Sequence, residues 1–167
     1  MKWLIIAAVT MSLVGSMMWV MPSKRQRQQA DLRTRARSLG FQVQLSRITA
    51  PRAEGESEAE HYNTAGYRLL RIGENGKKVQ TEPWHIFRVR SVRNEGLPEG
   101  WSWSVGERLL SEGQLDILRD MLSQLPQGIS SVESTPLYVT LYWDERGEES
   151  DLEQLKVQLQ RLLDNVF

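Results

Sequence analysis

The stretch LYVTLYW (137–143) decides the fold, because apolar and polar side chains alternate along its whole length. One side carries Leu137, Val139, Leu141 and Trp143, and the other carries Tyr138, Thr140 and Tyr142. A period of two predicts a strand with one face buried and the other open. We therefore expect Tyr138 and Tyr142 on an outer sheet face, as candidate protein contacts unless a helix covers them.

One helix is predicted before this strand in the sequence and one after it. The first spans 112–124, carries one stripe of leucine and methionine, and begins at a capping box formed by Ser111 and Gln114. The second spans 151–166 and begins at a similar pair, Ser150 and Glu153. Packing against a sheet explains both stripes, and the second stripe also fits a short coiled coil.

Residues 41–92, which precede the first of these helices, are predicted to form mainly β-strands. Residues 41–48 and 84–92 alternate in polarity, and 67–80 predicts a hairpin that turns at Asn75-Gly76. The acidic stretch 49–65 is too polar to bury and predicts a mobile loop. For 41–167 we expect an α+β domain, an antiparallel sheet with two helices packed on one face.

Two tryptophans, Trp101 and Trp103, lie in the Gly- and Pro-rich segment 94–107. Tryptophan dominates many binding surfaces, so this segment is a candidate protein contact. Large aromatic side chains also serve hydrophobic cores, so the segment is equally a candidate flap that closes the core.

The amino-terminal residues predict a transmembrane anchor over 1–22. No charge interrupts 3–21, and Trp3 and Trp19 mark the two ends as interfacial residues. A cleaved export signal fits less well, because the apolar run continues past the small residues that would form its cleavage site. Small residues at helical spacing predict either packing against another helix or a lipid-facing stripe; they are Ala8, Ser12, Gly15 and Ser16.

A basic juxtamembrane helix is predicted over 23–40, between a Ser23 cap and Gly40. Its cations are candidates for contact with anionic lipid headgroups; they are Lys24, Arg25, Arg27, Arg33, Arg35 and Arg37. Nucleic acid is the less favoured partner, because no aromatic side chains are interleaved with these cations. The excess of positive charge after the apolar run predicts that the body of the chain lies in the cytoplasm.

Charge is segregated along the chain although the net charge is zero. Residues 1–40 hold seven of the 21 Lys and Arg and one of the 21 Asp and Glu, which leaves 14 basic and 20 acidic residues for 41–167. Such a chain suits a molecule whose basic end meets an anionic surface.

The residue inventory excludes several kinds of chemistry. With no cysteine there is neither a thiolate nucleophile nor a Cys-based zinc site, and His61 and His85 are the only histidines. No phosphate-binding loop or nucleophile motif is present. We therefore expect no cofactor, no metal site and no catalytic residues.

The stretch MPSKRQRQQADLRTRARSLGFQVQL (21–45) follows the apolar run directly. Residues 3–45 together resemble the start of the YajC family, small accessory subunits of the bacterial Sec translocon, and of uncharacterised single-span inner-membrane proteins. The resemblance implies a membrane topology of that kind. It ends after residue 45, where the glycine-rich segment of that family has no counterpart.

These features predict a non-catalytic, single-pass inner-membrane protein whose cytoplasmic domain is an accessory or scaffold subunit of a membrane complex. Its expected partners are anionic lipids and a membrane protein, or a second copy bound through the span. One alternative is a module that tethers lipid or nucleic acid through the basic helix. The other is an enzyme whose site the sequence does not reveal.

Overall fold

The computed structural model describes residues 2–20, 22–71 and 81–165. It divides into two units, Met1–Asp31 and Leu32–Phe167, which we describe separately. The expected turn at Asn75-Gly76 lies outside the described residues, as does the side chain of Trp19.

The first unit holds helix α1 (Lys2–Val20) and the start of α2 (Lys24–Ser38). Ser23 caps α2 as the sequence predicts. The Gln26 amide N–H donates to the Ser23 hydroxyl at 3.2 Å, and the Ser23 amide donates to the Gln26 side chain at 2.8 Å. These two bonds satisfy donors that a helix start otherwise leaves free.

The predicted transmembrane anchor is wrong. Within the described part of the chain, no helix combines the length and the apolar character that a membrane crossing requires. Helix α1 has 19 residues, which at 1.5 Å per residue span roughly 28 Å against a hydrocarbon core of ~30 Å. It also includes the charged Lys2 and a run of small or hydroxylated residues, Thr10, Ser12, Gly15 and Ser16. The predicted single-pass topology and inner-membrane localisation depended on this anchor and are therefore wrong as well.

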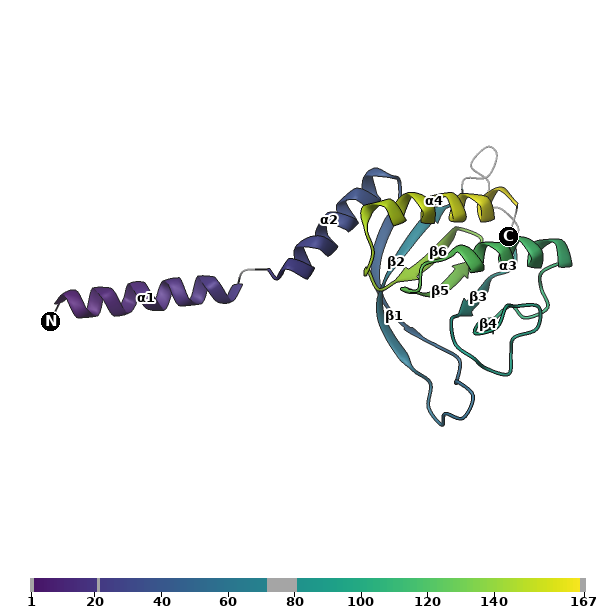
Figure 1. The fold of residues 1–167 in the computed structure, drawn as a ribbon, viewed down its shortest axis with the longest axis horizontal. Coiled ribbons are helices and arrows are strands. Elements are labelled where there is room, and N and C mark those ends of the chain that lie inside the picture. Colours follow the sequence, from purple (N-terminus) through teal and green to yellow (C-terminus); the bar gives the residue numbers. More distant parts are fainter. Residues whose placement is uncertain (1, 21, 72–80, 166–167) are drawn as a thin grey trace. The chain divides into compact units, whose positions relative to one another are not determined.

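The second unit is built on one antiparallel sheet (Figure 1). Its strands are β1 (Gln42–Thr49), β2 (His61–Leu70), β3 (Trp84–Phe87), β4 (Ser102–Val105), β5 (Ile129–Ser134) and β6 (Tyr138–Trp143). They lie in the order β1-β2-β6-β5-β3-β4. Strand β6, which holds most of the alternating stretch 137–143, is thus an inner strand flanked by β2 and β5.

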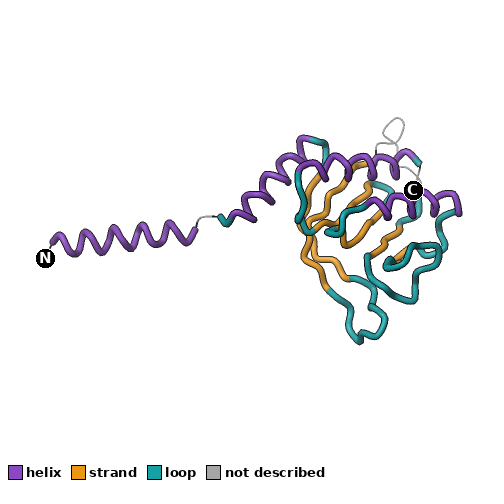
Figure 2. The backbone as a smooth tube through the Cα atoms, in the orientation of Figure 1, coloured by secondary structure: helices purple, strands orange, loops and turns teal. Residues whose placement is uncertain are grey.

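Helices α3 (Glu112–Gln124) and α4 (Glu149–Asp164) lie side by side over one face of this sheet (Figure 2). Their leucine stripes are buried, as the pattern of the sequence predicts. The second half of α2 joins the same core through Leu32 and Ala36, which are 2% and 0% exposed. The α+β domain therefore begins at Leu32 and has a third helical element that the sequence does not predict as core.

Aromatic side chains form much of this core. Trp84, Trp103 and Trp143 are essentially inaccessible, and Tyr67 meets the Trp143 ring edge-on at 5.5 Å between centroids. Burying a large aromatic side chain contributes on the order of 2–3 kcal/mol, so these rings contribute strongly to the stability of the fold.

Several predicted boundaries differ from the structure. Strand β2 begins at His61, inside the stretch expected to be a mobile loop, because residues 61–65 complete the ladder with β1. Strands β4 and β5 are not predicted at all. The capping box at Ser111 is confirmed, but α4 begins two residues earlier than expected, capped by Glu148 and Asp151 rather than Ser150 and Glu153.

Candidate protein-interaction site

The two tryptophans predicted as a contact surface or a core flap both lie in the core. Trp101 is 5% exposed and Trp103 is fully buried, where it meets Trp84 edge-on. This placement is what the core-flap alternative expects. Trp101 keeps an edge on a surface groove, described below.

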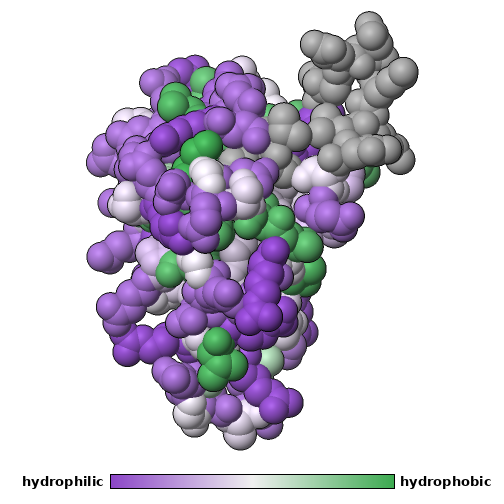
Figure 3. Space-filling view, turned by 90° about the vertical axis from the view of Figure 1, so that its right-hand side faces the viewer, coloured by the Kyte–Doolittle hydropathy of each residue, from purple (hydrophilic) through white to green (hydrophobic). Residues whose placement is uncertain are grey.

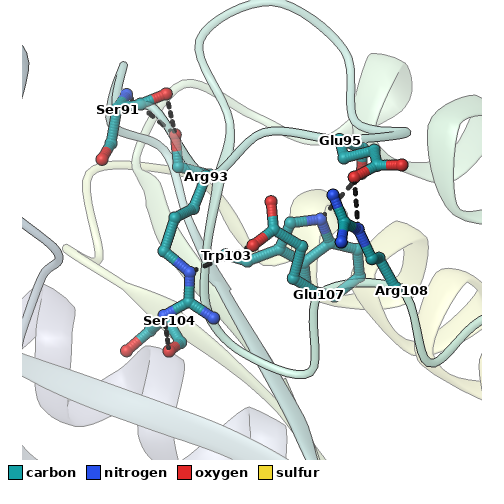
Figure 4. Close-up of polar contacts among 8 residues, drawn as sticks. Ser91, Arg93, Glu95, Trp103, Ser104, Glu107 and Arg108 are labelled. Atoms are coloured by element: carbon teal, nitrogen blue, oxygen red, sulfur yellow. Dashed lines mark hydrogen bonds and ion pairs between the residues drawn. The ribbon is translucent and has the colours of Figure 1, made fainter.

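The segment around these tryptophans is fixed by polar contacts (Figure 4). The Trp103 indole N–H donates to the Glu95 carbonyl at 2.9 Å, and the Glu95 carboxylate pairs with Arg108 at 2.6 Å. Arg93 donates to the Ser104 carbonyl at 3.1 Å and to the Glu107 carboxylate at 3.2 Å. A segment without long strands or helices is thereby held in one shape.

A groove of about 590 Å³, open to solvent, lies between this segment and the end of α3. Its apolar wall comes from Leu122 and Leu125 of the helix end and from Trp101 of the opposite segment. The remaining lining residues are Arg88, Pro98, Glu99, Gly100, Ser123 and Gln127. The size is within the range of sites that take a small ligand or a short peptide segment.

Among the residues that the structure describes, Arg88 is the only cation that lines this groove. Its guanidinium donates to the Pro126 carbonyl at 2.9 Å and to the Leu125 carbonyl at 3.3 Å, and it lies over the Trp101 ring at 4.9 Å from the centroid. Burial lowers the pKa of Arg88. Among the described residues no carboxylate lies within ion-pair distance of it, because Glu99 pairs with Arg90 instead.

The opposite sheet face carries the predicted contact residues of β6. The described helices of the second unit, α3 and α4, lie over the other face of the sheet. Tyr142 is nevertheless only 5% exposed, and its hydroxyl donates to Glu133 at 2.7 Å. Burial, together with this hydrogen bond, raises the pKa of the Tyr142 phenol. Tyr138 is half-buried, with the Arg68 guanidinium 4.3 Å from its ring centroid. Tyr142 is thus occupied within the protein, and Tyr138 remains partly accessible.

His85 and Ser131 form the one pair on this face that resembles a catalytic arrangement. The His85 Nε2 and Ser131 Oγ atoms are 3.1 Å apart, a distance typical of a nucleophile and its base. Ser131 is fully buried, however, and burial lowers the pKa of His85 to about 4. A substrate has no access to this hydroxyl, so the pair serves to satisfy two buried polar groups.

The described residues contain no cluster of His, Asp and Glu that could hold a metal ion. The groove itself offers apolar walls, the Arg88 cation and the Glu99 carboxylate, which pairs with Arg90.

The predicted lipid-contact cations of α2 divide into two groups. Arg33 is committed to the protein, because its guanidinium makes a two-pronged pair with Glu145 at 2.7 and 2.6 Å while Tyr67 donates to the same carboxylate at 2.7 Å. Arg35 pairs with Glu153 at the surface at 3.3 Å. The other four are exposed; they are Lys24, Arg25, Arg27 and Arg37. Their contact with lipid or nucleic acid stays a prediction.

The predicted helix-packing residues of α1 are all exposed within their own unit. Trp3 is exposed as well. The Ser16 hydroxyl donates to the Leu13 carbonyl at 2.8 Å, so this polar group is satisfied inside the helix. Association through Ala8, Ser12, Gly15 and Ser16 stays a prediction.

The surface of the second unit gives no larger apolar site on the side seen in Figure 3. That face is largely hydrophilic, and its hydrophobic areas are small compared with the polar surface around them. Scattered apolar side chains are normal on a protein surface.

No family model, curated protein or solved structure matches this chain.

Sequence reasoning found Trp101 but missed Arg88. In the sequence Arg88 alternates with Phe87 and Val89 and is predicted to point outward from a strand. In the structure β3 ends at Phe87, and the chain then turns so that the Arg88 side chain reaches the end of α3. No local signal marks this turn, because it depends on where α3 ends.

Proposed function

We propose that residues 32–167 are a non-catalytic protein-interaction domain, an accessory or scaffold unit that holds a segment of a partner protein in the groove beside α3. The observation that carries this proposal is the half-buried Arg88 guanidinium, which faces the groove without a carboxylate partner among the described residues.

The groove combines two features of recognition sites. Its apolar wall of Leu122, Leu125 and the Trp101 edge offers hydrophobic burial. Its cation is fixed in place by two carbonyls and an aromatic ring, so binding does not have to order it. A preorganised guanidinium favours a carboxylate, which it can bind through two parallel hydrogen bonds.

The partner segment therefore carries an Asp, a Glu or a carboxyl terminus next to an apolar side chain. Enzymatic activity is not proposed. The Thr49 hydroxyl and the His61 imidazole lie 2.9 Å apart at an exposed site, but neither residue lines the groove, and the Ser131 hydroxyl beside His85 is buried.

In-cell photocrosslinking tests the proposal. A photoreactive amino acid is placed at Ser123 in one strain and at Gln127 in another, because both line the groove and are exposed. The control position is Gln160, which is exposed on α4. We expect one and the same protein to be captured from Ser123 and Gln127, through a peptide that contains an acidic residue, and not from Gln160. Equal capture from all three positions, or none from the groove, would contradict the proposal.

A further inference from the structure

Strand β1 forms one edge of the sheet and is open on its other side. Among the described residues it pairs only with β2, over all eight of its positions. An edge of this length presents a row of backbone donors and acceptors that can pair with another strand.

The direction of these backbone groups follows from two hydrogen bonds. The Ala50 amide donates to the Glu60 carbonyl at 2.9 Å in the β1–β2 register, so the even-numbered residues of β1 point their N–H and C=O groups toward β2. The Phe41 amide points the other way and donates to the Ala36 carbonyl at 3.0 Å. The outward groups of the open edge are therefore those of Val43, Leu45, Arg47 and Thr49.

The side chains leave this edge without the usual protection. Edge strands are commonly blunted by several charges, by proline or by bulges. Arg47 is the only charged residue of β1, and the strand has no proline and no register shift against β2. Leu45 is 66% exposed at the middle of the edge, on the face that the helices cover elsewhere.

We propose that β1 pairs antiparallel with β1 of a second copy of this chain, about a two-fold axis at Leu45, so that the two sheets become continuous. In this register the outward groups of Val43 meet those of Arg47 in the second copy, and the two Leu45 residues exchange their own N–H and C=O bonds. The exposed leucine side chains come to lie directly opposite each other and leave water.

Neighbouring registers are less favourable. An axis at Arg47 puts two guanidinium groups opposite each other, which is destabilising. An axis at Ser46 pairs Val43 with Thr49, but it sets the exposed Leu45 against Arg47 instead of an apolar partner. An axis at Gln44 places Arg47 opposite Phe41, whose outward amide is already bonded to Ala36. The axis at Leu45 places only Thr49 opposite Phe41, and it alone sets the two exposed leucines against each other.

The decisive variant is Leu45→Lys in the full chain, which sets two ammonium groups opposite each other at the axis. Its matched control is Val157→Lys, because Val157 is likewise an exposed aliphatic residue, 64% exposed on α4. By analytical ultracentrifugation we expect dimers of the wild type and of Val157→Lys, and a dimer dissociation constant at least ~10-fold higher for Leu45→Lys, since 1.4 kcal/mol corresponds to tenfold.

Amide hydrogen exchange identifies the surface. In the dimer the amides of Val43, Leu45 and Arg47 are protected, and dilution or Leu45→Lys removes this protection. A monomeric wild type, or a dimer that Leu45→Lys leaves intact, would overturn the inference, and association through α1 would produce the second of these results. Protection of β1 only in the presence of a different protein would overturn it as well. None of these results bears on the groove, so this inference and the proposed function can fail separately.

Discussion

Glu145 shows how one residue connects α2 to the sheet. Its carboxylate is 3% exposed and accepts from both Arg33 and Tyr67. Hydrogen bonding to this carboxylate raises the pKa of Arg33 despite some loss of solvation. A buried carboxylate with two charge-assisted bonds is stable only while its partners remain.

Arg33→Ala should therefore destabilise the protein by about 3 kcal/mol, because it leaves a buried carboxylate without its cation. Arg35→Ala is the matched control: it is the same substitution two residues away, and the pair of Arg35 with Glu153 is exposed. We expect the control to change the free energy of unfolding by less than ~1 kcal/mol. Urea denaturation of the two variants checks this, and equal effects would show that Glu145 does not need its partner.

His85 makes stability depend on pH. Burial lowers its pKa to about 4 from the ordinary value of 6.5, so between these pH values the unfolded chain binds the proton more readily than the folded one. The free energy of unfolding is therefore unaffected by the protonation of His85 above pH 6.5. It decreases as the pH falls from 6.5 toward 4, by roughly 3 kcal/mol in total.

Replacement of this histidine isolates its effect. His85→Gln should flatten the decline of the unfolding free energy between pH 6.5 and 4 relative to the wild type. His61→Gln is the control, because His61 is the other histidine and is exposed on β2. Thermal unfolding across this pH range measures both, and identical slopes for His85→Gln and the wild type would contradict the account.

At the scale of elements, the turn between β4 and α3 depends on Gly106. Its φ is +90°, a conformation that L side chains rarely adopt, and a Cβ there would lie 2.9 Å from the Trp84 Cα atom. Trp84 is 1% exposed and cannot move away. The turn therefore requires glycine.

Gly106→Ala should lower the free energy of unfolding by about 2 kcal/mol, from backbone strain and from contact with Trp84. Gly113→Ala is the control, since it makes the same change in the first turn of α3 with nothing within 4 Å of the new Cβ. The control should be neutral or stabilise by up to ~1 kcal/mol. Chemical denaturation distinguishes the two, and a Gly106→Ala variant as stable as the wild type would mean that the turn relaxes freely.

Periodicity predicts the elements that pack through one continuous stripe. The sequence predicts α3 with its bounds and its cap, and the inner strand β6 within one residue, because apolar and polar residues alternate along that strand, although the structure buries both of its faces from Val139 to Trp143. The four-residue strand β4 is not predicted, since Trp101, Ser102 and Trp103 are all buried and no alternation remains. Burial there comes from the long segment before β4, which local sequence does not specify.

The same limit explains the errors at the amino terminus and in the groove. Leu32 and Ala36 are too few to mark a core-facing stripe among so many cations, so the sequence assigns the helix to a separate segment. The groove forms because the end of β3 and the end of α3 lie close together in the folded protein. Arg88 and Leu125 are 37 residues apart in the sequence, so they come into contact only after folding. The span is predicted from the uncharged run and from Trp3 and Trp19 at its ends, and no weight is given to the polar and small residues of α1.

At the scale of the whole molecule, the division of the chain falls inside α2. The second unit begins at Leu32, and its core includes Leu32, Ala36 and Phe41. Removal of residues 1–31 should leave the melting temperature within ~4 °C of the full chain, because no core residue is lost. Removal of residues 1–40 should cost several kcal/mol, since it takes two buried apolar side chains and the partner of Glu145. Equal melting temperatures of the two truncated chains would contradict this division.

The most direct test of the central claim measures how tightly the captured partner segment binds to variants of Arg88. Arg88→Gln removes the groove cation. Arg71→Gln is the matched control, because Arg71 is also partly buried and does not line the groove; its guanidinium donates to the Thr135 carbonyl over a distance of 2.7 Å. Loss of a charge-assisted hydrogen bond costs about 1.5–3 kcal/mol, so we expect Arg88→Gln to weaken binding roughly 10- to 100-fold in titration calorimetry. Arg71→Gln, once shown to be folded, should bind like the wild type. Unchanged affinity of Arg88→Gln would contradict the account.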